Sequence, residues 1–443
     1  MVRMADAAPT QASPGSIAQA FGSRDFRRYQ LARLIVIIGA EAQSIAVAWL
    51  IYQITHSALM LGYTGLALFL PGILCVLPAG HAADRYDRRV LIIVCYILQC
   101  IASTALFWLA YSGTHHIGYI YGVLVLIGIG RAFSGPASSA LVPQLVPKDD
   151  FVKAVTWGAS TFQIANVVGP SLGGILFTLP LRGTFASLRG APIVFLFTVI
   201  CMAVFVGLMI SLHVRPGRAD SKAISVDTVL AGLRYVWSAK LLLGSISLDL
   251  FAVLLGGAVS LMPIFASDIL HVGARGLGLL RAAPSIGALV ISLTLAFHPI
   301  KRRAGGLMLT CVAVFGAATI GFGLSRTLPL SLLMLFLIGA NDMVSVVVRS
   351  SLLQLATPPE MRGRVSAVSW LFIGASNEFG EFESGVTAYW WGAVRAVVIG
   401  GIGSMMVTGT WAILFPKLRN ADKLTAESLL ASSVTQNSQE PVE

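Results

Sequence analysis

Apolar residues fall along the chain in twelve stretches of about 20 residues, separated by short polar segments. An α-helix rises 1.5 Å per residue, so about 20 residues cross a hydrocarbon core of about 30 Å. The pattern therefore predicts an all-α integral membrane protein with twelve transmembrane helices. The predicted spans cover residues 31–53, 58–80, 90–112, 117–142, 157–180, 191–213, 241–266, 276–298, 306–325, 328–350, 365–388 and 394–416.

One long polar connection, at about 214–240, divides the twelve stretches into two sets of six. Its second part places five apolar residues on one stripe of a helix: Val226, Val229, Leu230, Leu233 and Trp237. Such a stripe is typical of an amphipathic helix at a membrane surface or of an ordinary linker helix. We expect a disordered cytoplasmic tail at 1–20, a six-helix bundle at 21–213, the linker at 214–240, a second six-helix bundle at 241–418 and a disordered tail at 419–443.

The two halves echo one another. QLVPKDDFVKAVTW begins at Gln144 after the fourth predicted helix, and QLATPPEMRGRVSAVSW begins at Gln354 after the tenth. The offset is about half of the chain. Repeated halves are a transporter design, in which the substrate site lies between the repeats near the middle of the membrane.

Composition and charge agree with this design. Hydrophobic residues make up 56% of the chain and charged residues 12%, with a net charge of +11. If the N-terminus lies inside, the inside segments hold 22 Lys and Arg residues and the outside loops hold 5. The excess predicts a multi-pass protein of the cell (inner) membrane with both termini cytoplasmic. It also accounts for the basic balance, so the lipid bilayer is the expected partner and nucleic acid is not.

The sequence lacks the common signatures of enzymes and metal proteins. The five cysteines all fall in apolar runs without metal-ligand spacing, and there is no GxxxxGK[ST] loop or GxSxG elbow. We therefore predict no enzyme activity, no cofactor and no metal site. The sequence leaves the oligomeric state open.

Several charged residues lie inside the apolar stretches, where a charge costs at least about 2.5–3.5 kcal/mol and usually lines a polar path. They predict that the protein moves something across the membrane. A plainer interpretation is that some of the acids only neutralise Arg131, Arg281 or Arg349. The candidates for proton coupling are Glu41, Arg131, Asp249, Asp342, Glu378 and Glu381.

The segment GHAADRYDRR, which follows the second predicted helix, resembles the signature loop of the major facilitator superfamily. It departs from that pattern at Ala82, where the family has Leu, and at Asp87, where it has Gly. The resemblance implies a gate between this loop and the start of the eleventh helix; the alternative is a basic loop that only sets topology. The implied gating residues are Gly80, Asp84, Arg85, Arg88, Arg89 and Arg364.

Two further motifs resemble the same family. Arg131, followed four residues later by Gly135, is similar to a motif that the family links to proton transfer. NVVGPSLGG is similar to the core of the family's antiporter motif, which marks exporters; the alternative is generic helix packing. The matching antiporter residues are Gly169, Pro170, Gly173 and Gly174.

The stretch RGRVSAVSWLFIGASNEFGEFESG resembles the branch that holds the enterobactin exporter and transmembrane secretion effectors, and the likeness covers about residues 20–418. It implies a secondary active transporter that exports a small amphipathic molecule, siderophore-like or drug-like, in exchange for protons by alternating access of two bundles. In this family, helices 1, 4, 7 and 10 line the cavity. A nutrient importer, either symporter or facilitator, and a non-transporting signalling or assembly protein on the same fold stay open as alternatives.

Overall fold

The computed structural model describes residues 24–113, 116–147, 150–212, 226–298, 300, 302–358 and 361–422. Helices, turns and bends make up these ranges, and no strand occurs in them. The tails predicted at 1–20 and 419–443 lie outside the described residues, apart from 419–422. The first part of the predicted linker, 214–225, also lies outside them.

Each half of the described chain supplies six membrane crossings. The first half consists of α2 (Arg24–Thr55), α3 (Ala58–Leu74) followed by α4 (Val76–Arg85), α5 (Arg88–Tyr111), α6 (Ile117–Leu145), α7 (Phe151–Phe177), the short η2 (Gly183–Leu188) and α8 (Ala191–Ile210). The second half begins with α9 (Val226–Ser238), which precedes its crossings. It continues with α10 (Lys240–Leu255), η3 (Ala258–Leu261), α11 (Met262–Ile264), η4 (Phe265–Ile269), α12 (Gly273–Phe297), α13 (Ala304–Leu324), α14 (Leu328–Ala356), α15 (Arg362–Trp391), α16 (Ala393–Leu414) and α17 (Pro416–Arg419).

Nine spans among the described residues are long and apolar enough to cross a membrane, where Lys240–Ile269, which runs from α10 through η4, is counted as one span. The remaining three crossings are less apolar or shorter: α3 has 17 residues, α7 carries Gln163 and Asn166, and α15 carries three glutamates. All three lie where the halves meet, because α15 packs on α3 and α7 packs on α12. Gln163, Glu378 and Glu381 therefore face protein instead of lipid, and the fold is the expected twelve-helix membrane bundle.

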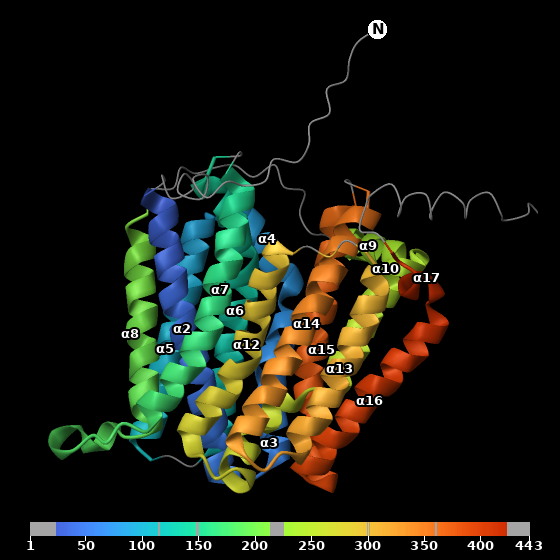
Figure 1. Ribbon diagram of the computed structural model, residues 1–443. Helices are drawn as coiled ribbons and strands as arrows, with labels where there is room; N and C mark the ends of the chain where they lie inside the picture. The colour runs from blue at the N-terminus through green and yellow to red at the C-terminus, as the bar shows by residue number, and fades with distance from the viewer. Residues whose placement is uncertain are drawn as a thin grey trace, which may run out of the picture.

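The two halves stand side by side as separate bundles (Figure 1), with α2, α5, α6, α7 and α8 in one and α13, α14, α15 and α16 in the other. We call the end where α2 begins and α4 and α14 end the basic face, and the opposite end the far face. The basic face carries Arg24, Arg85, Arg88, Lys240, Arg362 and Lys417. Helix α9 lies at this face in Figure 1, beside the ends of α15 and α10.

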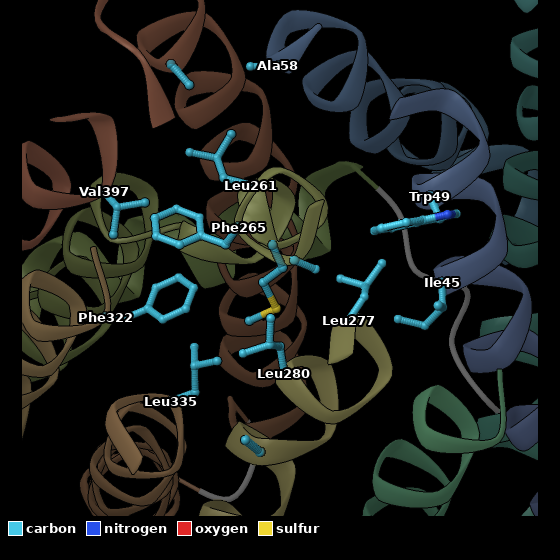
Figure 2. Packing of buried hydrophobic residues seen from close by; sticks show 14 of the residues in the cluster. Ile45, Trp49, Ala58, Leu261, Phe265, Leu277, Leu280, Phe322, Leu335 and Val397 are labelled. Atoms are coloured by element: carbon cyan, nitrogen blue, oxygen red, sulfur yellow. The ribbon is translucent and has the colours of Figure 1, made fainter. Parts of the chain in front are cut away.

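An apolar cluster joins the two bundles toward the far face. Figure 2 shows Ile45 and Trp49 of α2 directed at Leu277 of α12, with Leu261, Phe265, Phe322 and Val397 of the other bundle behind them. Phe265 and Phe322 stack with ring centroids 4.5 Å apart, and Trp49 meets Phe177 edge-on at 6.4 Å. Because these residues are buried, the far end of the space between the bundles is filled.

The seventh crossing differs from the continuous helix predicted at 241–266. Helix α10 ends at Leu255, and the chain reaches the far face through the short segments η3, α11 and η4. The break falls at Gly256 and Gly257, which have no side chain and lie close to other helices. A methyl group added at Gly257 would lie 3.0 Å from the backbone of Gly380 in α15. The interruption brings Ser260 and Phe265 to the interface between the bundles.

Candidate functional site

A cavity of about 210 Å³ lies between the two bundles, near the middle of the membrane-crossing helices. Helices α2, α3, α6, α12 and α15 line it, together with Ser260 of η3. Its charged lining residues are three carboxylates and two guanidinium groups. They are Glu41, Arg131, Arg281, Glu378 and Glu381.

The carboxylates of α15 converge on α3. Glu378 and Glu381 are three residues apart, so they share one helix face. A methyl group added at Gly65 of α3 would lie 3.0 Å from one carboxylate oxygen of Glu378 and 3.1 Å from one of Glu381. The absence of a side chain at Gly65 therefore makes room for both carboxylates between the helices.

The five charged groups act on one another electrostatically. Glu378 lies within range of the charges of Glu381, Arg131 and Arg281, and Glu381 within range of those of Arg281 and Glu41. With every group ionised, the formal charge of the cluster is one negative unit. Because water is scarce at this depth, the cluster favours binding of a proton or another positive group.

Two polar atoms in the lining lack a partner in the described structure. The side-chain oxygen Oε1 of Gln43 and the Nε of Arg281 are both buried without a hydrogen bond. An unsatisfied buried polar group costs about 1–3 kcal/mol, so such atoms usually mark a place for water or a ligand. Gln43 was not predicted as a site residue; its polarity inside an apolar run was the one available signal.

The predicted proton-coupling candidates divide into two groups. Glu41, Arg131, Glu378 and Glu381 meet at the central cavity, whereas Asp249 and Asp342 lie inside the second bundle. Asp249 of α10 forms an ion pair with Arg349 of α14, and their side chains are 7% and 4% exposed. Asp249 therefore neutralises an arginine in this structure, as in the plainer interpretation of the buried acids.

Glycines of the antiporter-like motif allow α7 to approach α2 closely. A methyl group at Gly169 would lie 2.5 Å from the Cβ of Glu41, and one at Gly173 would lie 2.8 Å from the Cα of Ala42. Small residues permit such contact between helices in a membrane. This part of the motif thus fixes the helix that carries Glu41.

The other face of the same motif joins the two bundles. A methyl group at Gly174 would lie 2.6 Å from the carbonyl oxygen of Ala274 in α12, and one at Gly278 would lie 2.6 Å from the carbonyl oxygen of Pro170. About two turns nearer the middle of the membrane, Gln163 donates a hydrogen bond of 3.0 Å to the carbonyl of Ser285. The motif is therefore a backbone-to-backbone contact across the bundle interface.

The predicted gating segment lies at the basic face, where it forms the end of α4, the connection at residues 86–87 and the start of α5. Asp87, which departs from the family pattern, caps α5 by accepting hydrogen bonds from the backbone N–H groups of Arg89 (2.8 Å) and Val90 (3.2 Å). Arg89 in turn donates to the carbonyls of Met209 (2.9 Å) and Ile210 at the end of α8. A cation at a helix C-terminus stabilises the last carbonyls, so Arg89 ties the loop to α8.

The other gating candidates are only partly placed. Gly80 is buried in α4, Arg85 ends that helix and is exposed, and Arg88 begins α5. Arg364 lies in the first turn of α15, where its guanidinium approaches the sulfur of Met361 at 3.6 Å. The side chain of Asp84 lies outside the described part of the chain, so its predicted contact with α15 stays a prediction.

At the far face, a hydrogen bond crosses between the bundles. The hydroxyl of Tyr52, near the end of α2, donates to a carboxylate oxygen of Asp268 in η4. Sequence reasoning missed this pair because its members are 216 residues apart and neither lies in a recognisable motif. Together with the apolar cluster of Figure 2, the hydrogen bond closes this end of the central cavity.

Two six-helix bundles with a charged cavity between them define a transporter of the major facilitator superfamily. Residues 16–440 match the family model described as transmembrane secretion effector, and the chain belongs to this family. The family and the relatives below are transporters and not enzymes, as the sequence predicted.

Two curated relatives are enterobactin exporters. The chain is 27% identical over 394 residues to the enterobactin exporter EntS of Citrobacter koseri, and 26% identical over the same length to that of Shigella boydii serotype 4. In both comparisons the alignment covers 86% of this chain and 86% of the relative.

Solved structures share the fold at low identity. A bacterial homologue of the human lysosomal transporter Spinster matches with a TM-score of 0.66 at 14% identity, over 95% of this chain and 99% of that chain. The D-xylose–proton symporter matches with a TM-score of 0.66 at 13% identity, over 86% of this chain and 97% of that chain. These likenesses concern the fold alone.

Proposed function

We propose that the protein exports a small amphipathic molecule, siderophore-like or drug-like, in exchange for protons by alternating access of its two bundles. The observation that carries this proposal is the cluster of three carboxylates and two guanidinium groups at the cavity between the bundles. A transporter needs a group there that binds a proton in one half of the cycle and releases it in the other.

The excess of one acid supports coupling to protons. When the cluster holds one proton it is formally neutral, and when it loses that proton it carries one negative charge. Burial favours the neutral state and a bound cationic or hydrogen-bond-donating cargo favours the charged state, so proton and cargo compete for the cluster. Glu378 and Glu381 are the groups on which we place this exchange, with Glu41 and Arg131 setting their field.

The lining supports an amphipathic cargo. Apolar side chains of Val47, Leu61, Leu68, Leu124 and Ile127 share the cavity with the charged groups. Drug-sized ligands usually occupy about 300–1,000 Å³, so a cargo of that size needs a wider state of this cavity than the 210 Å³ found here. The relatives named as enterobactin exporters favour a siderophore-like cargo and outward movement.

Sidedness follows from the charge distribution. We assign the basic face, where the Lys and Arg residues gather, to the cytoplasm of a cell (inner) membrane, with both termini cytoplasmic. The bundles then meet at the outer end, where Tyr52, Trp49 and Phe265 close the cavity. In this assignment export requires that the outer contact opens after cargo has entered from the cytoplasmic side.

The motifs at the bundle surfaces serve this change of state. We assign the gate at the cytoplasmic face to Asp84 and Arg364, and the sliding surface between the bundles to Gly169, Pro170, Gly173 and Gly174. A glycine backbone contact supports such a surface because no side chain has to be displaced when α7 moves along α12.

The test is cargo accumulation in cells. Two probes are used, enterobactin and ethidium, in a strain that lacks its own exporters, with and without the protein and with and without an uncoupler. We expect less accumulation of at least one probe when the protein is present, and loss of this difference when the uncoupler collapses the proton gradient.

Glu383 offers a matched control on the same helix. Its carboxylate accepts a hydrogen bond of 2.6 Å from Thr387 and does not line the central cavity. Glu383→Gln should export as the wild type does, whereas Glu378→Gln should not. If the protein increases accumulation of the probes, it imports them and the proposed export is wrong. If it lowers accumulation equally with and without the uncoupler, export has another driving force than the proton gradient.

A further inference from the structure

A second, much smaller cavity lies inside the C-terminal bundle, apart from the central one. Its volume is about 10 Å³, which is room for one water-sized particle. Ala252 and Val253 of α10 and Val312 and Phe315 of α13 form apolar walls. The polar lining residues are Asp249, Asn341, Asp342 and Ser345.

One polar side chain that lines this cavity has no hydrogen-bond partner among the described residues. The hydroxyl oxygen of Ser345 is buried without a hydrogen bond, and the residue is 2% exposed. A serine in a helix usually donates to a carbonyl one turn earlier, as Ser171 does to Val167 at 3.0 Å. An unpartnered hydroxyl in an apolar surrounding is costly, so it indicates a missing ligand.

The neighbouring oxygens point to the same place. Asp342 and Ser345 are three residues apart and Asn341 is four residues before Ser345, so they share a stripe of α14. The amide nitrogen of Asn341 donates to the carbonyl of Leu337 at 2.8 Å, which leaves its side-chain oxygen for another partner. Carboxylate, amide carbonyl and hydroxyl oxygens together are a ligand set for a hard cation.

The charges decide which cation fits. Within the part of the chain that the structure describes, Asp249 is paired with Arg349 and Asp342 has no ion pair, so Asp342 is left as one uncompensated carboxylate in the lining. A monovalent cation brings the formal sum of Asp249, Asp342 and Arg349 to zero, whereas a divalent cation leaves a positive charge in apolar surroundings. Within the described residues no group of three His, Cys, Asp or Glu side chains could hold a metal ion, which also disfavours a divalent site.

We infer that this cavity is a binding site for one sodium ion, which Asp342, Asn341 and Ser345 hold. Asp249 is not a ligand of the ion, because it forms the ion pair with Arg349. Sodium fits a cavity of one-water size better than the larger potassium ion does. A proton would satisfy Asp342 but would give the oxygens of Ser345 and Asn341 no common ligand. The ion would link α14 to the wall formed by α10 and α13, inside one bundle.

The experiment is equilibrium binding to the purified full-length protein in detergent. Binding of ²²Na⁺ is measured in choline chloride at constant ionic strength, with NaCl or KCl as competitor. We expect saturable binding of about one ion per chain, displaced by NaCl and much more weakly by KCl. Asp342→Asn and Ser345→Ala should each weaken binding about tenfold or more, because each removes an ion ligand.

Ser245→Ala is the matched control, since that buried hydroxyl donates to the carbonyl of Leu242 at 3.0 Å and does not line the cavity. It should bind sodium as the wild type does. If Asp342→Asn fails to fold, Ser345→Ala still decides the question. The absence of saturable ²²Na⁺ binding, or binding that survives both Asp342→Asn and Ser345→Ala, would overturn the site.

The assay needs no transport, so its outcome is separate from that of the proposed function. Loss of sodium binding leaves proton-coupled export through the central cavity standing. Binding that disappears in Glu378→Gln and persists in Asp342→Asn would place the ion in the central cavity and would also overturn this site.

Discussion

The buried ion pair between Asp249 and Arg349 gives the sharpest prediction about stability. Removing one partner of a buried pair leaves an unpaired charge and typically costs about 3–5 kcal/mol. Asp249→Asn leaves the guanidinium of Arg349, but Asp342 lines the same cavity and can partly compensate it. We therefore expect the lower end, about 3 kcal/mol, for Asp249→Asn.

Arg349→Met should cost more, about 5 kcal/mol, because it leaves two carboxylates around one small cavity without a cation. The double variant Asp249→Leu with Arg349→Met should recover most of this loss, since a buried pair replaced by apolar side chains is often neutral or stabilising. The difference between the double variant and the sum of the single variants measures the coupling.

The assay is equilibrium unfolding of the purified variants in mixed detergent micelles, in sodium-free buffer, followed by tryptophan fluorescence. Ser245→Ala, a buried change on the same helix, is the reference for a substitution that breaks no ion pair. The ion pair does not have the energetic role assigned to it if Asp249→Asn and Arg349→Met have the same free energy of unfolding as the wild type. The same conclusion follows if the double variant loses as much free energy of unfolding as the two single variants lose together.

Three further predictions concern the conformational state and the orientation of the protein in the membrane. The two that use reporter cysteines are measured in a variant that lacks the native cysteines. Tyr52→Phe removes the hydrogen bond across the far face, which is worth about 1.5 kcal/mol because its acceptor is exposed. A reporter cysteine at Ser260 should therefore react about tenfold faster with an impermeant thiol reagent added outside. An unchanged rate would show that the bond does not hold this end closed. Asp84→Asn should leave the protein folded and inserted but remove most transport, and full transport would reduce the loop to a topology signal. Ser112→Cys should react from outside intact cells and Asn420→Cys should not; reversed labelling would invert the orientation proposed above.

The sequence was sufficient for the twelve crossings because each apolar stretch has the length of a membrane span. It did not foresee the break after Leu255, since Gly256 and Gly257 lie among apolar residues and a glycine pair is compatible with either a continuous helix or a turn. The boundary between α3 and α4 at Cys75 was not foreseen either. The nearest helix-breaking residue, Pro71, lies one turn before the break and inside α3, so its position does not mark the boundary.

The charged residues of the site could be found from the sequence, but their grouping could not. Glu41 and Asp249 occupy similar depths in the first helix of each half, and only the packing shows that one faces the central cavity and the other faces Arg349. Gln43 and Ser345 escaped notice because a single polar residue in an apolar run is common. Their importance arises from being buried without a partner, which is a property of the tertiary structure.

Exchange of a proton at the acids of the central cavity is the central claim, and transport into liposomes tests it most directly. The purified protein is reconstituted, a pH gradient is imposed, and uptake of the probe that cells export is followed for wild type, Glu378→Gln, Glu381→Gln and Glu383→Gln. The proposed function predicts gradient-driven uptake by wild type and Glu383→Gln, and its loss in Glu378→Gln and Glu381→Gln. Uptake that persists without the gradient, or that is equal in all four proteins, would contradict proton coupling at this cavity.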